Sequence, residues 1–182
     1  MSKIYFFLII LLMPLIHNID PYEFDFGQGK SGEDWCVIND GVMGGLSRGK
    51  AQMKENSLFF SGSISLENNG GFTSFRAPFK RMNLSGFSTV EVRYKSTGRT
   101  CALSFDQSTR FWLPNHKLPL PLSDDWNTVS IPLTDLNEYR MGRKTGRNMS
   151  LDKAASVIRI GIITDSKDAG EFTFEIDYVK FI

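Results

Sequence analysis

The chain has 182 residues, a length typical of one domain around a single hydrophobic core. Its 21 Lys and Arg residues nearly balance 20 Asp and Glu residues, which leaves a formal net charge of +1. A chain with this balance has no overall field to attract nucleic acid, so we expect no nucleic-acid partner. Hydrophobic residues form 41% of the sequence, an ordinary share that argues against an intrinsically disordered chain.

Residues 1–20 are interpreted as separate from the folded domain. Lys3 precedes an apolar run at positions 4–16 that suits a secretory signal and is short for a membrane span. The next residues offer no pair of small residues for cleavage, so an uncleaved membrane anchor is the alternative. A lipoprotein signal and a mitochondrial transit peptide fit poorly, because the first cysteine is Cys36 and the first arginine is Arg48. We expect residues 21–182 to form one exported domain, periplasmic or associated with the cell envelope, that contacts a membrane only through an uncleaved leader.

Beyond the leader, apolar residues recur with a period of two, as in half-buried strands. This pattern predicts strands at residues 58–60, 90–94, 101–105, 129–133, 158–162 and 172–176. Turn-forming clusters separate them at residues 96–98, 125–127 and 165–170, and residues 151–156 form the longest helical pattern. Many short strands with frequent turns indicate an all-β protein, although periodicity alone leaves β-sandwich and β-barrel open.

Two segments rich in turn-forming residues stand out, WCVINDGVMGGLSR at 35–48 and ENNGGFTSFR at 67–76. Asn and Asp side chains bond their own backbone and glycines accept positive φ, so each segment should form a tight turn. We predict that the two turns pack together, with Arg48 or Arg76 binding main-chain carbonyls or the Asp40 carboxylate. The alternative is a pocket floor, where the glycines let a ligand approach the backbone and the arginines bind its anionic or polyol groups. The candidate residues are Trp35, Asn39, Asp40, Met43, Gly44, Gly45, Ser47, Arg48, Asn68, Asn69, Gly70, Gly71, Ser74 and Arg76.

These two motifs resemble the family of complex I intermediate-associated protein, the thirty-kilodalton assembly factor of respiratory complex I. The likeness continues through Gly142-Arg143, Leu151-Asp152 and residues 160–162 and 170–177, so it covers roughly residues 24–182. The resemblance implies a galactose-binding-like jelly-roll β-sandwich. It also implies an assembly factor or chaperone for NADH:ubiquinone oxidoreductase (complex I) or for another protein partner.

The sequence offers little for catalysis. Outside the leader His116 is the single imidazole, and its neighbouring prolines predict an exposed loop, so we expect neither a catalytic base nor a zinc site there. A glycosidase pairs two carboxylates, for which the candidates are Asp40, Glu67, Asp106, Glu175 and Asp177. Asp40 is better explained as a turn residue, Glu67 as a strand-end residue, and Glu175 and Asp177 as outward-facing strand residues. We predict no enzyme activity, no cofactor and no metal, with calcium on rim-loop oxygens of Asp40, Asn68 or Asp106 as the alternative.

Residues 27–32 have the glycine spacing of a dinucleotide loop but lack the following helix, and are interpreted as a flexible lead-in. Cys36 and Cys101 form either one disulfide or two buried free thiols.

The remaining surface signals favour binding. A mobile loop carries four cations, Arg140, Arg143, Lys144 and Arg147. We expect it to bind a carboxylate, a phosphate or an acidic protein face, with simple exposure to solvent as the alternative. Trp112 lies between Phe111 and Leu113, and three roles are open for it: a platform for stacking sugars, a protein contact or a core residue. Trp35 and Trp126 are expected to pack in the core or against turns. We therefore predict a binding module for a protein partner, with carbohydrate as the alternative ligand.

Overall fold

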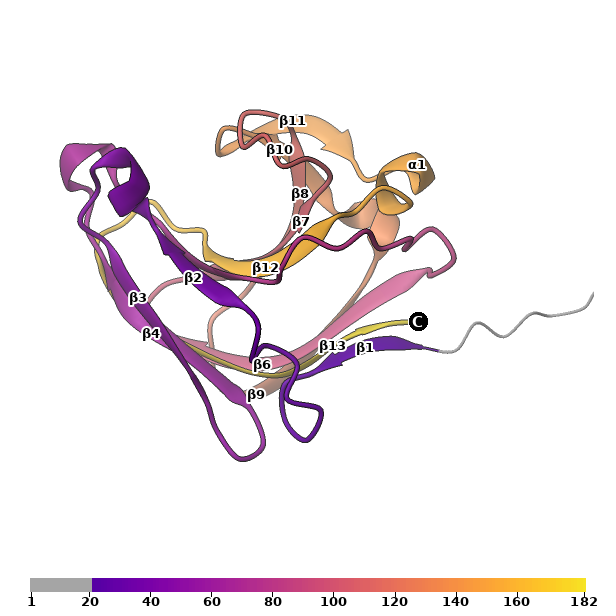
Figure 1. Cartoon of the computed structure of the whole chain (residues 1–182), viewed down its shortest axis with the longest axis horizontal. Helices are drawn as coiled ribbons and strands as arrows, with labels where there is room; N and C mark the ends of the chain where they lie inside the picture. Colours follow the sequence, from indigo (N-terminus) through magenta and orange to yellow (C-terminus); the bar gives the residue numbers. More distant parts are fainter. Residues whose placement is uncertain (1–20) are drawn as a thin grey trace, which may run out of the picture.

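Two antiparallel β-sheets lie face to face in the computed structural model, which describes residues 21–182 (Figure 1). Sheet A has the order β3-β4-β13-β6-β9, with β1 pairing to β13. Its strands are β1 (Tyr22–Asp25), β3 (Arg48–Met53), β4 (Leu58–Ile64), β6 (Thr89–Thr97), β9 (Ser123–Pro132) and β13 (Gly170–Phe181). Sheet B has the order β11-β10-β8-β7-β12-β5-β2. Its strands are β2 (Cys36–Asn39), β5 (Thr73–Arg76), β7 (Cys101–Asp106), β8 (Asn115–Leu120), β10 (Asn137–Arg140), β11 (Arg143–Asn148) and β12 (Arg159–Thr164).

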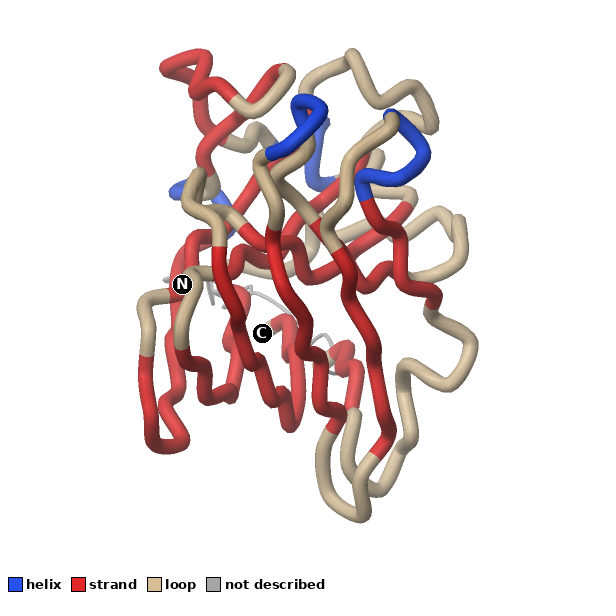
Figure 2. Tube along the Cα trace, turned by 90° about the vertical axis from the view of Figure 1, so that its left-hand side faces the viewer, coloured by secondary structure: helices blue, strands red, loops and turns tan. Residues whose placement is uncertain are grey.

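This architecture confirms the all-β, jelly-roll β-sandwich prediction. The predicted leader lies outside the described residues. Short helices occupy the connections between strands (Figure 2), namely η1 (Asp40–Met43), η2 (Glu67–Asn69), η3 (Leu133–Asp135) and α1 (Leu151–Ala154). Across residues 21–182, no helix has the length and apolar character needed to span a membrane.

The core lies between the sheets and is built from the predicted period-two residues. In sheet A the inward positions of β4 and β13 bring aromatic rings together, with the ring centroids of Phe60 and Phe172 5.0 Å apart. In sheet B the inward side chains of β7 and β12 are Leu103, Phe105, Ile160 and Ile162, all buried. Alternation therefore assigns one face of each sheet to the core and leaves the other face for solvent or a ligand.

The outer face of sheet B is concave. Figure 1 shows β8, β10 and β11 turned up from β12, β5 and β2, away from sheet A. We call this surface, the side of sheet B that faces away from sheet A, the concave face.

Four local predictions are wrong. Residues 125–127 form no turn but lie inside β9, where the pairing with β6 is irregular and the half-exposed Trp126 ring contacts Arg93 and Lys95. Glu67 lies in η2 rather than at a strand end. His116 is buried on β8, because it pairs between Phe105 of β7 and Glu138 of β10. The cationic segment at 140–147 is a β10–β11 hairpin rather than a loose loop.

Candidate functional site

The two glycine-rich motifs meet at one edge of the sandwich around the Asp40 carboxylate. Asp40 is 1% exposed and accepts hydrogen bonds from the backbone N–H groups of Ser47 (2.9 Å), Gly71 (2.7 Å) and Phe72 (3.3 Å). Burial alone would raise the pKa of Asp40, but hydrogen bonds from these three residues outweigh it and lower the pKa below its ordinary value. The prediction that the two segments pack together is confirmed. We call this cluster the Asp40 knot.

Amide side chains add further hydrogen bonds around the knot. Asn39 Oδ1 accepts the Gly49 N–H at 2.9 Å and also the Thr73 hydroxyl. Asn68, at a φ of 55°, donates from Nδ2 to the Gly44 carbonyl at 3.1 Å. The Asn39–Thr73 and Asn68–Gly44 contacts join the two segments, so the knot fixes the rim of the sandwich.

Two glycines are required because the backbone passes very close to the buried carboxylate. A Cβ at Gly45 would lie 2.3 Å from Asp40 Cγ, and one at Gly70 would lie 2.6 Å from Asp40 Oδ2. Such distances leave no room for any side chain at either position. The carboxylate is thus enclosed by main chain and closed to a ligand, which favours architecture over a pocket floor.

The predicted arginine partners of Asp40 are wrong. Arg48 is exposed and starts β3 on the outer face of sheet A, and Arg76 lies on the concave face with Ser74. Backbone N–H groups replace them, since they satisfy a buried carboxylate without burying a long charged side chain. Other motif residues also lie apart from a shared site: Met43 is exposed, while Trp35 packs in the core.

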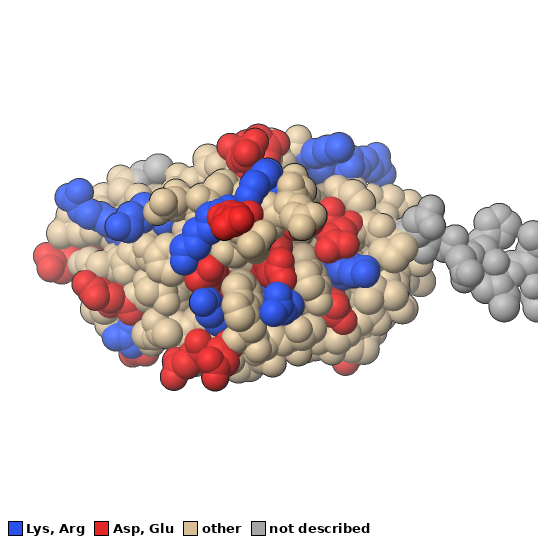
Figure 3. All heavy atoms as spheres, turned by 90° about the horizontal axis from the view of Figure 1, so that it is seen from below, with Lys and Arg blue, Asp and Glu red and all other residues tan. Residues whose placement is uncertain are grey.

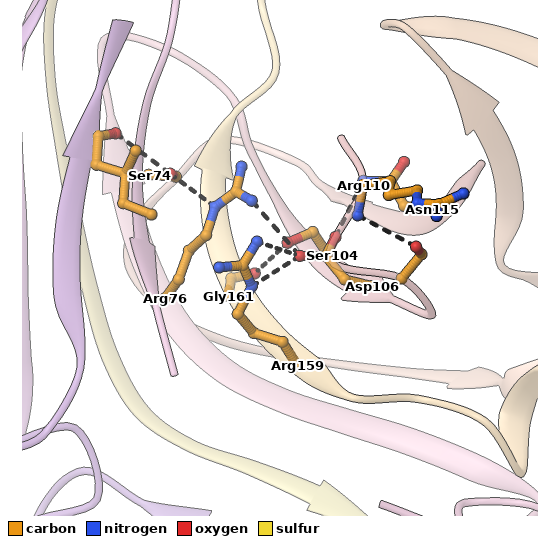
Figure 4. A network of polar contacts seen from close by, with 10 residues as sticks. Ser74, Arg76, Ser104, Asp106, Arg110, Asn115, Arg159 and Gly161 are labelled. Atoms are coloured by element: carbon orange, nitrogen blue, oxygen red, sulfur yellow. Dashed lines mark hydrogen bonds and ion pairs between the residues drawn. The ribbon is translucent and has the colours of Figure 1, made fainter. Parts of the chain in front are cut away.

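A second polar network occupies the concave face (Figure 4). Asp106 on β7 binds Arg159 on β12, with Oδ2 2.8 Å from Nε and 2.7 Å from Nη2. The same oxygen lies 3.4 Å from Nη1 of Arg76, whose Nε donates to Ser74 Oγ at 2.8 Å. Asn115 Nδ2 donates to the other Asp106 oxygen at 3.4 Å. Two guanidinium groups therefore share one carboxylate.

Strand register explains how this network forms. Gly161 of β12 pairs with Arg76 of β5 on one side and with Ser104 of β7 on the other. A Cβ at Gly161 would come within 2.8 Å of Arg76 Cγ, so the glycine leaves space for the arginine to cross the strand. Ser104 Oγ donates to the Gly161 carbonyl at 3.1 Å, so the Ser104 side chain lies across this strand as well.

The network carries one positive charge more than it neutralises, in a place with little water. The side chains of Arg76 and Arg159 are 17% and 13% exposed, and that of Asp106 is 9% exposed. Burial and the Arg159 charge lower the pKa of Arg76, against the opposing effect of Asp106. An arginine keeps its proton in any such setting, so the surplus persists at neutral pH.

The outer face of sheet A also has two cations on one carboxylate, but there the cations are exposed to water. Glu175 contacts Lys54 at 3.0 Å and Lys95 at 3.2 Å, but these lysine side chains are 42% and 36% exposed. Water therefore solvates the extra cation there. Seen from below, the outer face of sheet A intersperses both signs of charge (Figure 3).

Aromatic side chains border the concave network. The Phe79 ring, half exposed, stacks 4.1 Å from the Arg159 guanidinium, and the Tyr139 ring lies 4.9 Å from Lys117 Nζ. Trp112 is 47% exposed on the loop between β7 and β8, which also carries Phe111 and Arg110. The Trp112 and Phe111 rings meet edge to face at 86°, so Trp112 is not a core residue.

The remaining chemical candidates do not assemble into a site. His116 Nδ1 lies 3.1 Å from Gln107 Oε1, and burial lowers the pKa of His116. Within residues 21–182, no group of His, Cys, Asp and Glu could hold a metal. The calcium alternative fails because backbone N–H groups occupy Asp40 and guanidinium groups occupy Asp106.

The two thiols are free and well separated. Cys36 is exposed on β2, where it pairs with Arg76 of β5, and Cys101 is buried on β7. Two strands, β5 and β12, lie between them in sheet B. Both earlier alternatives, a disulfide and two buried thiols, are therefore wrong.

Sequence reasoning missed most of the concave network. Asp106 was weighed only as a possible acid or calcium ligand, and Arg159, Lys117 and Tyr139 were not singled out. One signal was available, because Arg159 and Gly161 alternate with Ile160 and Ile162 and must share the face opposite the core.

Comparisons with known proteins agree with this architecture. The model of the family described as Complex I intermediate-associated protein 30 (CIA30) matches residues 24–176. No curated protein matches the sequence. Among solved structures, a family 11 carbohydrate-binding module of a cellulosomal cellulase from Clostridium thermocellum has a TM-score of 0.63 at 12% identity, over 88% of this chain and 94% of that one.

Two further structures share the fold. A family 11 module from Clostridium thermocellum in complex with a β-1,3-1,4-mixed-linked tetrasaccharide has a TM-score of 0.57 at 14% identity, over 88% and 95% of the two chains. The agarase AgWH50C has a TM-score of 0.53 at 12% identity, over 87% of this chain but only 24% of its own. At such identities the likeness shows a shared β-sandwich fold.

Proposed function

Because the chain belongs to the complex I intermediate-associated protein 30 family, we propose that it is a non-catalytic binding domain that holds a segment of a protein partner on its concave face. The observation that carries this proposal is the pair Arg76 and Arg159 on a single carboxylate, Asp106. Buried charges are normally paired, so an unbalanced cation on an outer surface favours a partner that completes it.

The surroundings of this network favour a protein as the partner. Arg and Trp are enriched among the residues that contribute most to protein interfaces, and Trp112 lies exposed on a loop that joins two strands of sheet B. The β10–β11 hairpin adds exposed cations at the edge of the same sheet. Together they form a polar, cationic surface bordered by aromatic side chains.

The family supports a finer role. We propose that the domain acts as an assembly factor or chaperone that holds a partner subunit, with respiratory complex I as the partner that the family description names. We also propose that it works after export, at the cell envelope, as the predicted leader suggests.

The exposed thiol of Cys36 provides a position-specific test. Cys101 is fully buried and its pKa is raised by burial, so a thiol-directed photo-cross-linker will label Cys36 alone. In native envelope extracts, cross-linking from Cys36 should give one discrete protein adduct. The control is the double variant Cys36→Ser/Ser130→Cys, which moves the label to the outer face of sheet A. Identical adducts from both labels, or none from Cys36, would refute the proposal.

Carbohydrate binding is the second candidate function. It is favoured by the exposed Trp112 ring on the β7–β8 loop, since such rings stack on sugars. The edge-to-face angle between Trp112 and Phe111 argues against it, because the two rings do not form one flat platform. A glycan array separates the candidates: saturable glycan binding lost in Trp112→Ala would assign a sugar site to the β7–β8 loop.

A further inference from the structure

One row of side chains crosses five strands of the concave face. The register of sheet B places them opposite one another in the order Arg159, Asp106, Asn115, Tyr139 and Lys144. Neighbouring strands lie about 4.8 Å apart, so the row is about 19 Å long. An extended peptide advances about 3.3 Å per residue and would need about six residues to follow it.

Both ends of this row are cationic, and the guanidinium end has N–H groups to spare. Neither Arg76 Nη2 nor Arg159 Nη1 has a hydrogen-bond partner among residues 21–182, and neither atom is completely buried. At the other end Lys144 is exposed and forms no ion pair within this part of the chain. Guanidinium forks with free N–H groups match the geometry of a carboxylate.

The size and surroundings of the row select among acidic ligands. Phe79 offers apolar surface beside the Arg159 guanidinium, which the side chains of a peptide can cover. The rings of Trp112 and Phe111 cross at 86° and form no flat platform, so they do not favour a uronic-acid chain that stacks its sugar rings. Carboxylates on one face of an extended peptide recur at every second residue, so two of them six positions apart are separated by about 20 Å, which matches the distance between the two cationic ends of the row.

Taking the proposed function as its basis, we infer that the partner segment is an extended acidic peptide, with one carboxylate on Arg76 and Arg159 and another near Lys144. Lys144 is the hairpin cation on this face, because Arg143 pairs with Arg140 and points to the other side of the hairpin. The inference thus names the chemistry of the partner and the residues that recognise it.

The test uses synthetic peptides and the purified chain. Titration calorimetry with octaglutamate should detect saturable binding at 50 mM NaCl, while octaglutamine, the neutral peptide of equal length, should not bind. Binding should weaken at least tenfold in Arg159→Gln and less in Arg159→Lys, which keeps the charge but loses the fork. Arg48→Gln removes an exposed arginine from sheet A and should leave affinity unchanged.

Two measurements keep the test decisive if Arg159→Gln does not fold. Lys144→Gln changes one exposed hairpin residue on the row, and should weaken octaglutamate binding several-fold with an unchanged far-UV spectrum, whereas Arg143→Gln, on the other side of the hairpin, should not. Octaglutamate should also protect Cys36 from a thiol reagent, because Cys36 pairs with Arg76 on the same face.

Each contrary result has a distinct meaning. Equal binding of octaglutamate and octaglutamine, or tighter binding of a galacturonate octamer than of octaglutamate, overturns the inference. If Cys36 still cross-links one protein while the arginine variants have no effect on that adduct, the inference fails and the proposed function stands. If Cys36 gives no specific adduct, the proposed function itself fails.

Discussion

Asp40 and Asp106 are both buried aspartates in one small domain, yet different groups stabilise their negative charges. Three backbone N–H groups surround Asp40, and none of them can be shared with a ligand. Two arginine side chains surround Asp106, and they keep donors and charge in excess. Hydrogen bonds from the main chain stabilise the Asp40 carboxylate and leave no donor for a ligand. Ion pairs from two arginines leave excess positive charge at Asp106, which favours binding of an anion.

The largest expected effect comes from Asp40→Asn, which keeps the shape but removes the charge and one acceptor atom. At least one backbone N–H then faces an amide NH₂ in a buried place, and we expect a loss of about 3 kcal/mol in the free energy of unfolding. Urea denaturation will measure it, with the exposed Asp124→Asn as the control. A loss below about 1 kcal/mol would contradict the structural role of the knot.

The dependence of stability on acidic pH should also report the buried charge of Asp40. The pKa of Asp40 is lower in the folded state than in the unfolded chain, so its contribution is present above about pH 4 and is lost as pH falls through the folded value. Stability of the native chain should therefore fall more steeply below pH 4 than that of Asp40→Asn. Parallel curves of unfolding free energy against pH for the two proteins would exclude this linkage.

Asp106→Asn should cost less, about 2 kcal/mol, because water can reach parts of both arginines. The prediction that separates the two aspartates concerns ligand binding. With Asp106 neutral the concave face gains positive charge, so octaglutamate should bind more tightly, whereas Asp40→Asn should leave its affinity unchanged in the folded fraction. Calorimetry on both variants checks this. Equal octaglutamate affinities of Asp106→Asn and Asp40→Asn would contradict the different roles of the two aspartates.

The smallest effect is expected for Gly161→Ala. The new Cβ would lie 2.8 Å from Arg76 Cγ and 2.9 Å from the Phe75 carbonyl oxygen. The Arg76 side chain can move aside, but the Phe75 carbonyl oxygen belongs to the main chain, so we expect a loss of about 1.5 kcal/mol in stability together with weaker octaglutamate binding. The comparison variant is Gly45→Ala, where the Asp40 carboxylate cannot move and the loss of stability should be larger.

Sequence reasoning reached the knot but not the concave network, for a physical reason. The turn residues Asn39, Asp40 and Gly70 favour a local backbone conformation, so their role can be predicted before the fold is known. Arg76 and Asp106 meet only through the register of β5, β12 and β7, which short sequence patterns do not specify. The predicted partners of Arg76, main-chain carbonyls or the Asp40 carboxylate, therefore do not include Asp106.

The same limit explains the other differences. Alternating apolar residues predicted the central strands, but the β10–β11 hairpin has a polar, exposed second strand with no alternation to detect. His116 was judged from the prolines near it, although its position is decided by β7 and β10 on either side.

The β10–β11 hairpin also bears on how copies of the protein behave toward one another. β11 is the last strand of sheet B, and its outer edge has unpaired backbone groups of the kind that join strands between molecules. Its three cations would face their own counterparts if two such edges met, and like charges would push the copies apart. Concentrated solutions should therefore stay free of edge-to-edge aggregates, and neutralising these residues would remove that protection.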